Sequence, residues 1–155
     1  MRFVFVPVKP GGMHSKKTLS FRSETVALSI NLLLAIAAGG ALGALSRYFL
    51  TQQAMVWFGL EFPYGVLTVN VLGSFVLGLF AELPALAWSP SPALRAMVVV
   101  GFCGAFTTFS AFSLDVALLY ERGAFLKAGS YIVVSVALSI GALFSGIALI
   151  RSVYS

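Results

Sequence analysis

The stretch GFCGAFTTFSAFS, residues 101–113, lies in a long apolar segment and yet is rich in residues that disturb helices. Its positions hold two glycines, two threonines, two serines and four phenylalanines, with no charged residue. Threonine and serine side chains compete with the backbone for helical hydrogen bonds, and glycine loosens a helix. Within a membrane, an interrupted helix is tolerated only where it is buried in protein or lines a cavity. The stretch therefore predicts a broken transmembrane helix beside such a cavity.

This segment is one of four long runs without a charged residue. The runs lie between Glu24 and Arg47, Glu61 and Glu82, Arg95 and Asp115, and Lys127 and Arg151, and contain 22, 20, 19 and 23 residues. Each is close to the ~20 residues that a helix needs to cross a bilayer. The predicted fold is an all-α membrane protein of four transmembrane helices with a broken third helix. The expected helices span 26–50, 64–83, 93–120 and 128–150.

The composition excludes several classes of protein. Only 10% of the 155 residues are charged and 59% are hydrophobic, whereas soluble domains have about 25% charged residues. Cys103 is the only cysteine, so an intramolecular disulfide is impossible. The only histidine, His14, has no metal-ligand cluster or nucleophile–base pair near it, so we do not expect an enzyme. The net charge of +5 lies mainly in the N-terminal segment and loops, which favours anionic lipid over nucleic acid as its partner.

Residues 1–24 differ from the rest of the chain in being basic and broken by proline and glycine. We interpret them as a flexible basic N-terminal arm on the cytoplasmic side, preceding a four-helix membrane domain over 25–155. Two alternatives stay open: Met13 is the true start, or the segment is a targeting peptide.

The orientation of the four helices in the membrane is weakly specified outside this arm. One membrane face carries Arg95 and Arg151, and the other carries Arg47, Arg122 and Lys127. Such a small difference gives the positive-inside rule little to act on, so a chain that inserts in both orientations is possible. The positive charges of the arm instead favour a cytoplasmic N-terminus. The sequence leaves both topologies open.

Two features of the first predicted helix suggest its contacts. Gly39 and Gly43 form a G-x-x-x-G pair, which allows another helix backbone to approach closely. Arg47 is one of the two charged groups nearest the hydrocarbon, with Glu82. Both side chains can extend to the membrane surface, and Arg47 can also attract anions toward a vestibule.

Polar side chains inside the other helices need a reason, because each is costly in hydrocarbon. Asn70 has Ser74 one turn away on the same face. Tyr131, Ser135 and Ser139 follow one another at steps of four, which places three hydroxyls on one face. Each set is explained either by hydrogen bonds that hold the bundle together or by donors that line a pathway for an anion.

The predicted break suggests two more interactions. It would free backbone carbonyls near the midplane, and these are suitable ligands for a hard cation such as Na⁺. Phe109 and Phe112 lie three residues apart beyond the break, so they share a helix face. The edge of a phenyl ring is electropositive and can contact a small anion without binding it as tightly as a full charge.

The chain resembles the CrcB, or Fluc, family of fluoride channels. The resemblance is carried by GGALGALSRY in the first helix, GVLTVNVLGSFVLG in the second and GFCGAFTTFSAFSLD in the third, and covers about residues 34–150. It implies an antiparallel dual-topology homodimer, or a dimer with a paired homologue, with a structural Na⁺ at the dimer centre. The implied permeant ion is fluoride, exported across the cell membrane. The long arm and Ala105, where the family usually has a second glycine, depart from the family pattern.

The resemblance also implies roles for residues. The backbone carbonyls of Gly104 and Thr107 would hold Na⁺, and Arg47 would lie in the vestibule. The implied pore residues are Asn70, Thr108, Phe109, Ser110, Phe112, Tyr131, Ser135 and Ser139.

Two other functions are compatible with four short membrane helices. A small multidrug exporter also has four short helices, but it needs a carboxylate embedded in the membrane, and the first predicted helix has none. A non-transporting membrane assembly subunit would explain the glycines but not the aligned hydroxyls. Anion flux from liposomes, with chloride as the control, distinguishes these possibilities.

Overall fold

A computed structural model describes residues 30–86 and 90–154, and both ranges consist of helices joined by short connections. In chain order the elements are α1 (Ile30–Phe58), α2 (Tyr64–Leu86), α3 (Pro92–Arg95), the π-helix η1 (Ala96–Cys103), α4 (Gly104–Phe106), α5 (Phe109–Glu121) and α6 (Phe125–Tyr154). The predicted arm at residues 1–24 and the start of the first predicted helix lie outside the described residues.

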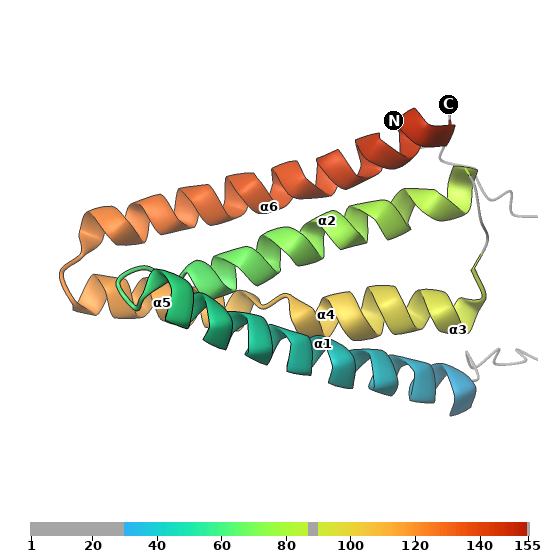
Figure 1. Ribbon diagram of the computed structural model, residues 1–155, viewed down its shortest axis with the longest axis horizontal. Coiled ribbons are helices and arrows are strands. Elements are labelled where there is room, and N and C mark those ends of the chain that lie inside the picture. Colours follow the sequence, from blue (N-terminus) through green and yellow to red (C-terminus); the bar gives the residue numbers. More distant parts are fainter. Residues whose placement is uncertain (1–29, 87–89, 155) are drawn as a thin grey trace, which may run out of the picture.

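The elements form four spans that are long and apolar enough to cross a membrane, which confirms the predicted fold class. The third span is made of α3, η1, α4 and α5 together, over Pro92–Glu121. Successive spans run in opposite directions, so α1 is parallel to the third span and α2 is parallel to α6 (Figure 1). The start of α1 and the end of α6 therefore lie at the same end of the bundle.

Local signals at several helix ends have a clear physical basis. Before α3, the Ser91 hydroxyl accepts a hydrogen bond from the Leu94 amide at 3.3 Å, and Pro92 occupies the first turn. Serine at the N-cap and proline just inside a helix are favoured because they suit the unpaired amides there. Gly59 and Gly123 follow α1 and α5 with φ of 78° and 70°. This left-handed conformation is easy for glycine and ends a helix.

The predicted boundaries were too short at the ends of the helices. The first was expected to end at residue 50, but α1 runs to Phe58. Proline was expected to end the second helix at residue 83, and α2 continues to Leu86. The last was expected to cover 128–150, and α6 covers Phe125–Tyr154. Absence of charge marks the apolar part of a helix and not its full length.

The third span is broken, as the sequence predicts, and the break lies at Thr107 and Thr108. Their backbone angles, φ −82°, ψ 155° and φ −153°, ψ 118°, are extended. Gly104 was expected to take part in the break, yet its own backbone is helical. The π-helix before it was not predicted, since no residue pattern in this stretch distinguishes a π-helix from an α-helix.

Glycines allow close contact at two helix crossings. A Cβ on Gly39 would overlap the Met97 carbonyl oxygen, and one on Gly43 would overlap that of Phe102. The G-x-x-x-G pair therefore does allow close approach, and its partner is η1. At the second crossing, a Cβ on Gly146 of α6 would overlap the Phe75 carbonyl oxygen of α2. Small residues at such crossings are typical of helices packed in membranes.

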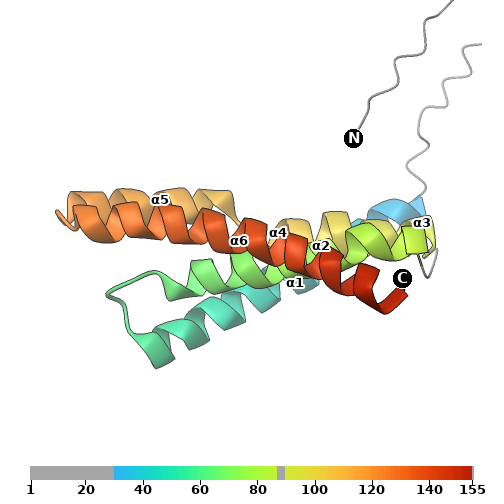
Figure 2. The same cartoon turned by 90° about the horizontal axis from the view of Figure 1, so that it is seen from above.

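The two halves of the third span pack against different helices. η1 and α4 lie along α1, whereas α5 lies alongside α6 (Figures 1 and 2). α2 makes its most extensive contact with α6. Ion pairs join the two ends of this α2–α6 pair: Lys127 Nζ lies 2.7 Å from Glu61 Oε2, and Arg151 Nε lies 2.9 Å from Glu82 Oε1. The break therefore lies between the half of the third span that packs on α1 and the half that packs on α6.

Candidate functional site

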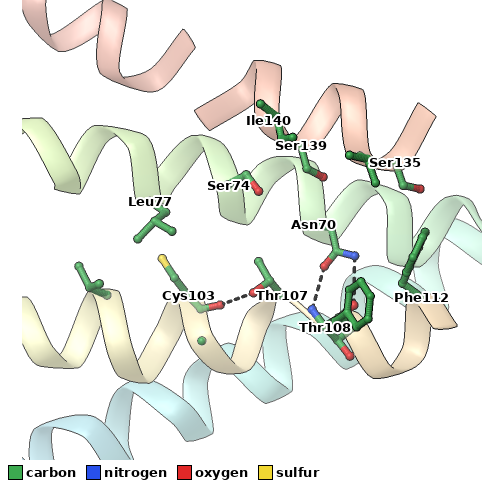
Figure 3. A pocket seen from close by; sticks show the side chains of 14 residues that line it. Asn70, Ser74, Leu77, Cys103, Thr107, Thr108, Phe112, Ser135, Ser139 and Ile140 are labelled. Atoms are coloured by element: carbon green, nitrogen blue, oxygen red, sulfur yellow. Dashed lines mark hydrogen bonds between the residues drawn. The ribbon is translucent and has the colours of Figure 1, made fainter. Parts of the chain in front are cut away.

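A cavity of about 460 Å³ lies beside the break, between α2, the third span and α6 (Figure 3). Eight of the residues implicated from the sequence line it: Asn70, Gly104, Thr107, Thr108, Phe109, Phe112, Ser135 and Ser139. Ser74 and Cys103 also line it. Among the described residues, its lining is largely aliphatic and aromatic, with amide, hydroxyl and thiol groups and no charged side chain.

Three other implicated residues do not line this cavity. Ser110 is one step away, with its hydroxyl 3.1 Å from that of Thr108. Tyr131 is completely buried behind Phe112, with ring centroids 5.2 Å apart. Arg47 lies on α1, away from the cavity lining, and its carbonyl accepts a hydrogen bond from the Thr51 hydroxyl at 2.8 Å.

Threonine side chains stabilise the break locally. The Thr107 hydroxyl donates to the Cys103 carbonyl at 2.9 Å, and so closes the end of α4. The Thr108 hydroxyl accepts from the Ala111 amide at 3.2 Å and caps the start of α5. Threonine is favoured at such caps because its oxygen satisfies an amide that has no helical partner. Two adjacent threonines therefore end one helix and begin the next.

Asn70 connects α2 to the break through both sides of its amide. Its Oδ1 accepts from the Thr108 amide at 2.8 Å, and its Nδ2 donates to the Thr108 carbonyl at 3.1 Å (Figure 3). An asparagine amide has two N–H donors, so one of them remains beside the cavity. Asn70 therefore fulfils the expected structural role between helices and also lines the cavity.

The break changes the hydrogen bonding of two carbonyls in particular. In a continuous α-helix the Gly104 carbonyl would accept from the Thr108 amide, and the Thr107 carbonyl from the Ala111 amide. The first amide donates to Asn70 Oδ1 instead, and the second donates to the Thr108 hydroxyl. The Gly104 and Thr107 carbonyls thus lose the donors that would satisfy them, which makes their oxygens available to a ligand.

Phe109 and Phe112 lie together beyond the break, as their spacing predicts, but in different surroundings. Their ring centroids are 5.4 Å apart and the rings are inclined by 40°. Phe109 is 77% exposed in the single chain, whereas Phe112 is 8% exposed and packs in the core. Phe109 therefore depends on lipid or another chain to cover it, while Phe112 is held within this chain.

The hydroxyls of α6 do not have the same surroundings along the helix. Tyr131 directs its hydroxyl to the Asp115 carboxylate of α5, at 3.2 Å. The Ser135 hydroxyl is buried and has no hydrogen-bond partner in the described part of the chain. Ser135 and Ser139 both line the cavity. A buried hydroxyl without a partner is costly, so Ser135 is the α6 residue most suited to bind a ligand.

Asp115 is the residue of this region that was missed from the sequence. In the sequence it only limits a run without charge, whereas in the structure its carboxylate accepts a hydrogen bond from the Tyr131 hydroxyl. A carboxylate within a membrane span normally has a function or a partner. This rule could have singled out Asp115 from the sequence. It could not have identified Tyr131 as the partner, because that depends on how α5 packs on α6.

Comparison with known proteins gives consistent matches over most of the chain. Residues 34–147 match the family model described as CrcB-like protein, Camphor Resistance (CrcB). A Rhodospirillum centenum protein named "Fluoride-specific ion channel FluC" is 52% identical over 79% of this chain and 98% of its own length. Proteins of the same name from Nitrobacter winogradskyi and Agrobacterium fabrum are 50% and 45% identical, over 77% and 81% of this chain and 94% and 99% of their lengths.

Proposed function

Because this chain belongs to the CrcB-like protein family, we propose that it is a fluoride-specific ion channel of the cell membrane. It is a multi-pass membrane protein with four helices able to span a bilayer. As a channel it carries out no chemical reaction and is not an enzyme. The observation that carries the proposal is the cavity at the break, whose largely apolar lining contains neutral donors and no charged side chain.

The lining suits a small, strongly hydrated anion. A pathway for such an ion has to replace its water with hydrogen-bond donors, and Asn70, Ser135 and Phe109 provide amide, hydroxyl and ring-edge groups. Conduction also requires that no site binds the ion too tightly. Neutral groups meet both requirements, because each contributes an interaction weaker than that of a lysine or arginine.

The direct test is ion flux from liposomes that contain the purified protein. We expect fluoride efflux, measured with a fluoride electrode, and little chloride efflux from matched vesicles. Equal fluoride efflux from protein-free vesicles, or none from vesicles shown to contain folded protein, contradicts the assignment.

In cells the channel would release fluoride from the cytoplasm. The interior-negative membrane potential is worth about 2.3 kcal/mol per charge for each 100 mV, and it drives an anion outward. Cells that express the chain should accumulate less fluoride than cells with an empty vector. Equal accumulation, with flux intact in liposomes, would contradict export and leave the channel assignment in place.

A structural Na⁺ is the proposed partner of the Gly104 and Thr107 carbonyls. Carbonyl oxygens are preferred ligands of hard cations, and both of these have lost their helical donors to Asn70 and Thr108. Na⁺ would hold the break in place and would not be transported. Replacing Na⁺ by a larger cation should reduce fluoride flux; unchanged flux without sodium counts against the site.

The functional unit is proposed to be an antiparallel dual-topology homodimer. Most of the Phe109 ring is exposed in the single chain. A pathway along this ring therefore needs a second chain to form its other wall. The nearly equal basic charge at the two membrane faces permits opposite orientations. Cross-linking and mass measurement in detergent should give a dimer, and a monomer that is active in flux would contradict this.

A further inference from the structure

Tyr131 is held by contacts from two elements besides its own helix. From α5, Phe112 packs against its ring and Asp115 accepts its hydroxyl hydrogen at 3.2 Å. From the connection between α1 and α2, Phe62 packs edge-to-face, with ring centroids 5.4 Å apart and the planes at 88°. Edge-to-face pairs are directional and are worth about 0.5–1.5 kcal/mol beyond the area they bury. Phe62 therefore restrains the orientation of the Tyr131 ring.

Phe62 and its neighbour in the α1–α2 connection make several contacts. Its neighbour Glu61 pairs with Lys127, which lies one turn before Tyr131 on the same face of α6. Two consecutive residues of the connection thus contact two consecutive turns of α6. Phe62 also packs on the Tyr64 ring at a centroid distance of 4.9 Å, and its carbonyl accepts from the Tyr64 amide at 2.8 Å.

Tyr131 contacts lining residues of two cavities, the one at the break and a second of about 230 Å³. The two cavities have no lining residue in common. Tyr131 contacts Phe112 of the first cavity, and Phe62 and Asp115 of the second. Phe62 does not line the first cavity, and the ring contact that links it toward that cavity is the one with Tyr131.

We infer that Phe62 is a positioning residue for the ion pathway: its ring fixes Tyr131, and Tyr131 in turn supports the Phe112 ring and keeps its own hydroxyl on Asp115. The inference rests on the proposed channel function. Removing the Phe62 ring leaves the lining of the pathway chemically unchanged but allows Tyr131 to move. Fluoride flux should then fall without loss of the fold.

The test compares variants in the same region. Phe62→Leu removes the ring but keeps apolar volume, and should lower fluoride flux roughly three- to tenfold, the range corresponding to one aromatic pair. Phe62→Tyr keeps the ring and should restore most of the flux. The matched control is Phe58→Leu, because Phe58 packs on Tyr64 at 5.3 Å and is not among the ring partners of Tyr131. It should leave flux unchanged.

Two further measurements separate positioning from a general structural effect. In a Tyr131→Leu background, Phe62→Leu should cause little additional loss, because contacting residues that act through one another are not additive. Labelling the five tyrosines with 3-fluorotyrosine gives a signal for Tyr131, assigned by its loss in Tyr131→Phe. This ¹⁹F signal should shift in Phe62→Leu by more than the lost ring current of Phe62 accounts for, and should not shift in Phe58→Leu.

The outcomes distinguish this inference from the channel assignment. An unmoved Tyr131 signal in Phe62→Leu overturns the inference whether or not the chain conducts fluoride. Wild-type flux through Phe62→Leu, or fully additive losses with Tyr131→Leu, overturns it as well. No flux through the wild-type protein argues against the proposed function, and the ¹⁹F shift still decides whether Phe62 positions Tyr131.

Discussion

The Asn70 side chain satisfies both backbone groups of Thr108, at 2.8 Å to the amide and 3.1 Å from the carbonyl. One residue of α2 thus provides the hydrogen bonds that the broken helix cannot provide for itself. Within a membrane this matters more than in water, because no solvent replaces a lost partner. The break consequently depends on hydrogen bonds from α2 as well as on the residues of the third span.

Asn70→Leu should therefore lower stability as well as fluoride flux. It leaves two buried backbone groups of Thr108 without partners, and each such group costs about 1–3 kcal/mol. Asn70→Asp keeps an acceptor for the amide and should be less destabilising. Thermal denaturation in detergent measures the stability of both variants. Ser74→Ala, one turn away and lining the same cavity, is the control; an Asn70→Leu protein as stable as wild type would contradict the role.

Phe109→Leu should fold and dimerise but lose most of its fluoride flux. The ring is 77% exposed in the single chain, and an apolar swap of similar volume costs under ~1.5 kcal/mol. What it removes is the electropositive ring edge. Phe112→Leu should reduce flux less but stability more, because it loses the contact with Tyr131. Size-exclusion profiles and electrode-measured efflux test both; near-normal flux through folded Phe109→Leu would rule out the ring-edge mechanism.

Gly146→Ala should destabilise the α2–α6 pair. Its Cβ would overlap the Phe75 carbonyl oxygen, a backbone atom that cannot move aside without separating the helices. Overpacking of this kind typically costs about 1–3 kcal/mol. Gly129→Ala on the same helix is the matched control, since its Cβ meets no atom within 4 Å, and alanine favours a helix by about 1 kcal/mol. Equal melting temperatures for the two variants would show that the crossing is not tight.

The Glu61–Lys127 ion pair should contribute to stability only above acidic pH. The hydrogen bond from Lys127 lowers the pKa of Glu61 from its usual value of 4.5. A lowered carboxylate pKa gives stability that is present above the usual value and is lost as the pH falls through the lowered one. Both side chains are largely exposed, so the effect is small.

The measurement is the difference in melting temperature between the wild type and Glu61→Gln. We expect the wild type to be slightly more stable at pH 7, with the difference disappearing well below pH 4.5. Glu121→Gln removes the same charge on the same side of the bundle and is the control, since no ion pair joins Glu121 within the described residues. A difference that grows on acidification would show that another group is responsible.

Deleting residues 1–24 should change the orientation of the protein in the membrane. The remaining basic residues at the two faces number two and three, a bias too small to select one topology. A tag at the C-terminus should therefore shift from mostly cytoplasmic toward an even mixture. Accessibility of the tag in sealed vesicles measures this, and a full-length protein that is already evenly mixed would show that these residues do not direct insertion.

Most of the fold was predictable from the sequence because each membrane helix contains a long run without a charged residue. The sequence also predicted the break, since Thr107 and Thr108 are residues that can replace backbone hydrogen bonds with their own hydroxyls. It placed the break before Phe109, as observed, but did not distinguish Gly104 from the threonines as the point where the backbone becomes extended. Gly104 loosens a helix on average, but here it stays helical, and the hydroxyl bonds of the threonines determine where the backbone becomes extended.

The site was less predictable wherever it depends on contacts between helices. Helical spacing correctly places Tyr131 and Ser135 on one face, but it says nothing about the direction of a long side chain. The Tyr131 hydroxyl points to Asp115 because α5 packs on α6 in this register. The contribution of Phe62 lies in a connection between helices, where no periodic pattern exists to indicate it.

The two halves of the third span pack on different helices, and this determines which contacts hold the span together at its break. Its first half packs on α1 and its second half on α6, and the extended residues Thr107 and Thr108 join them. Because Asn70 bonds this junction directly, a displacement of one half against the other would strain two hydrogen bonds at the cavity wall. The hydrogen bonds from α2 thereby hold the two halves of the third span in register at the cavity.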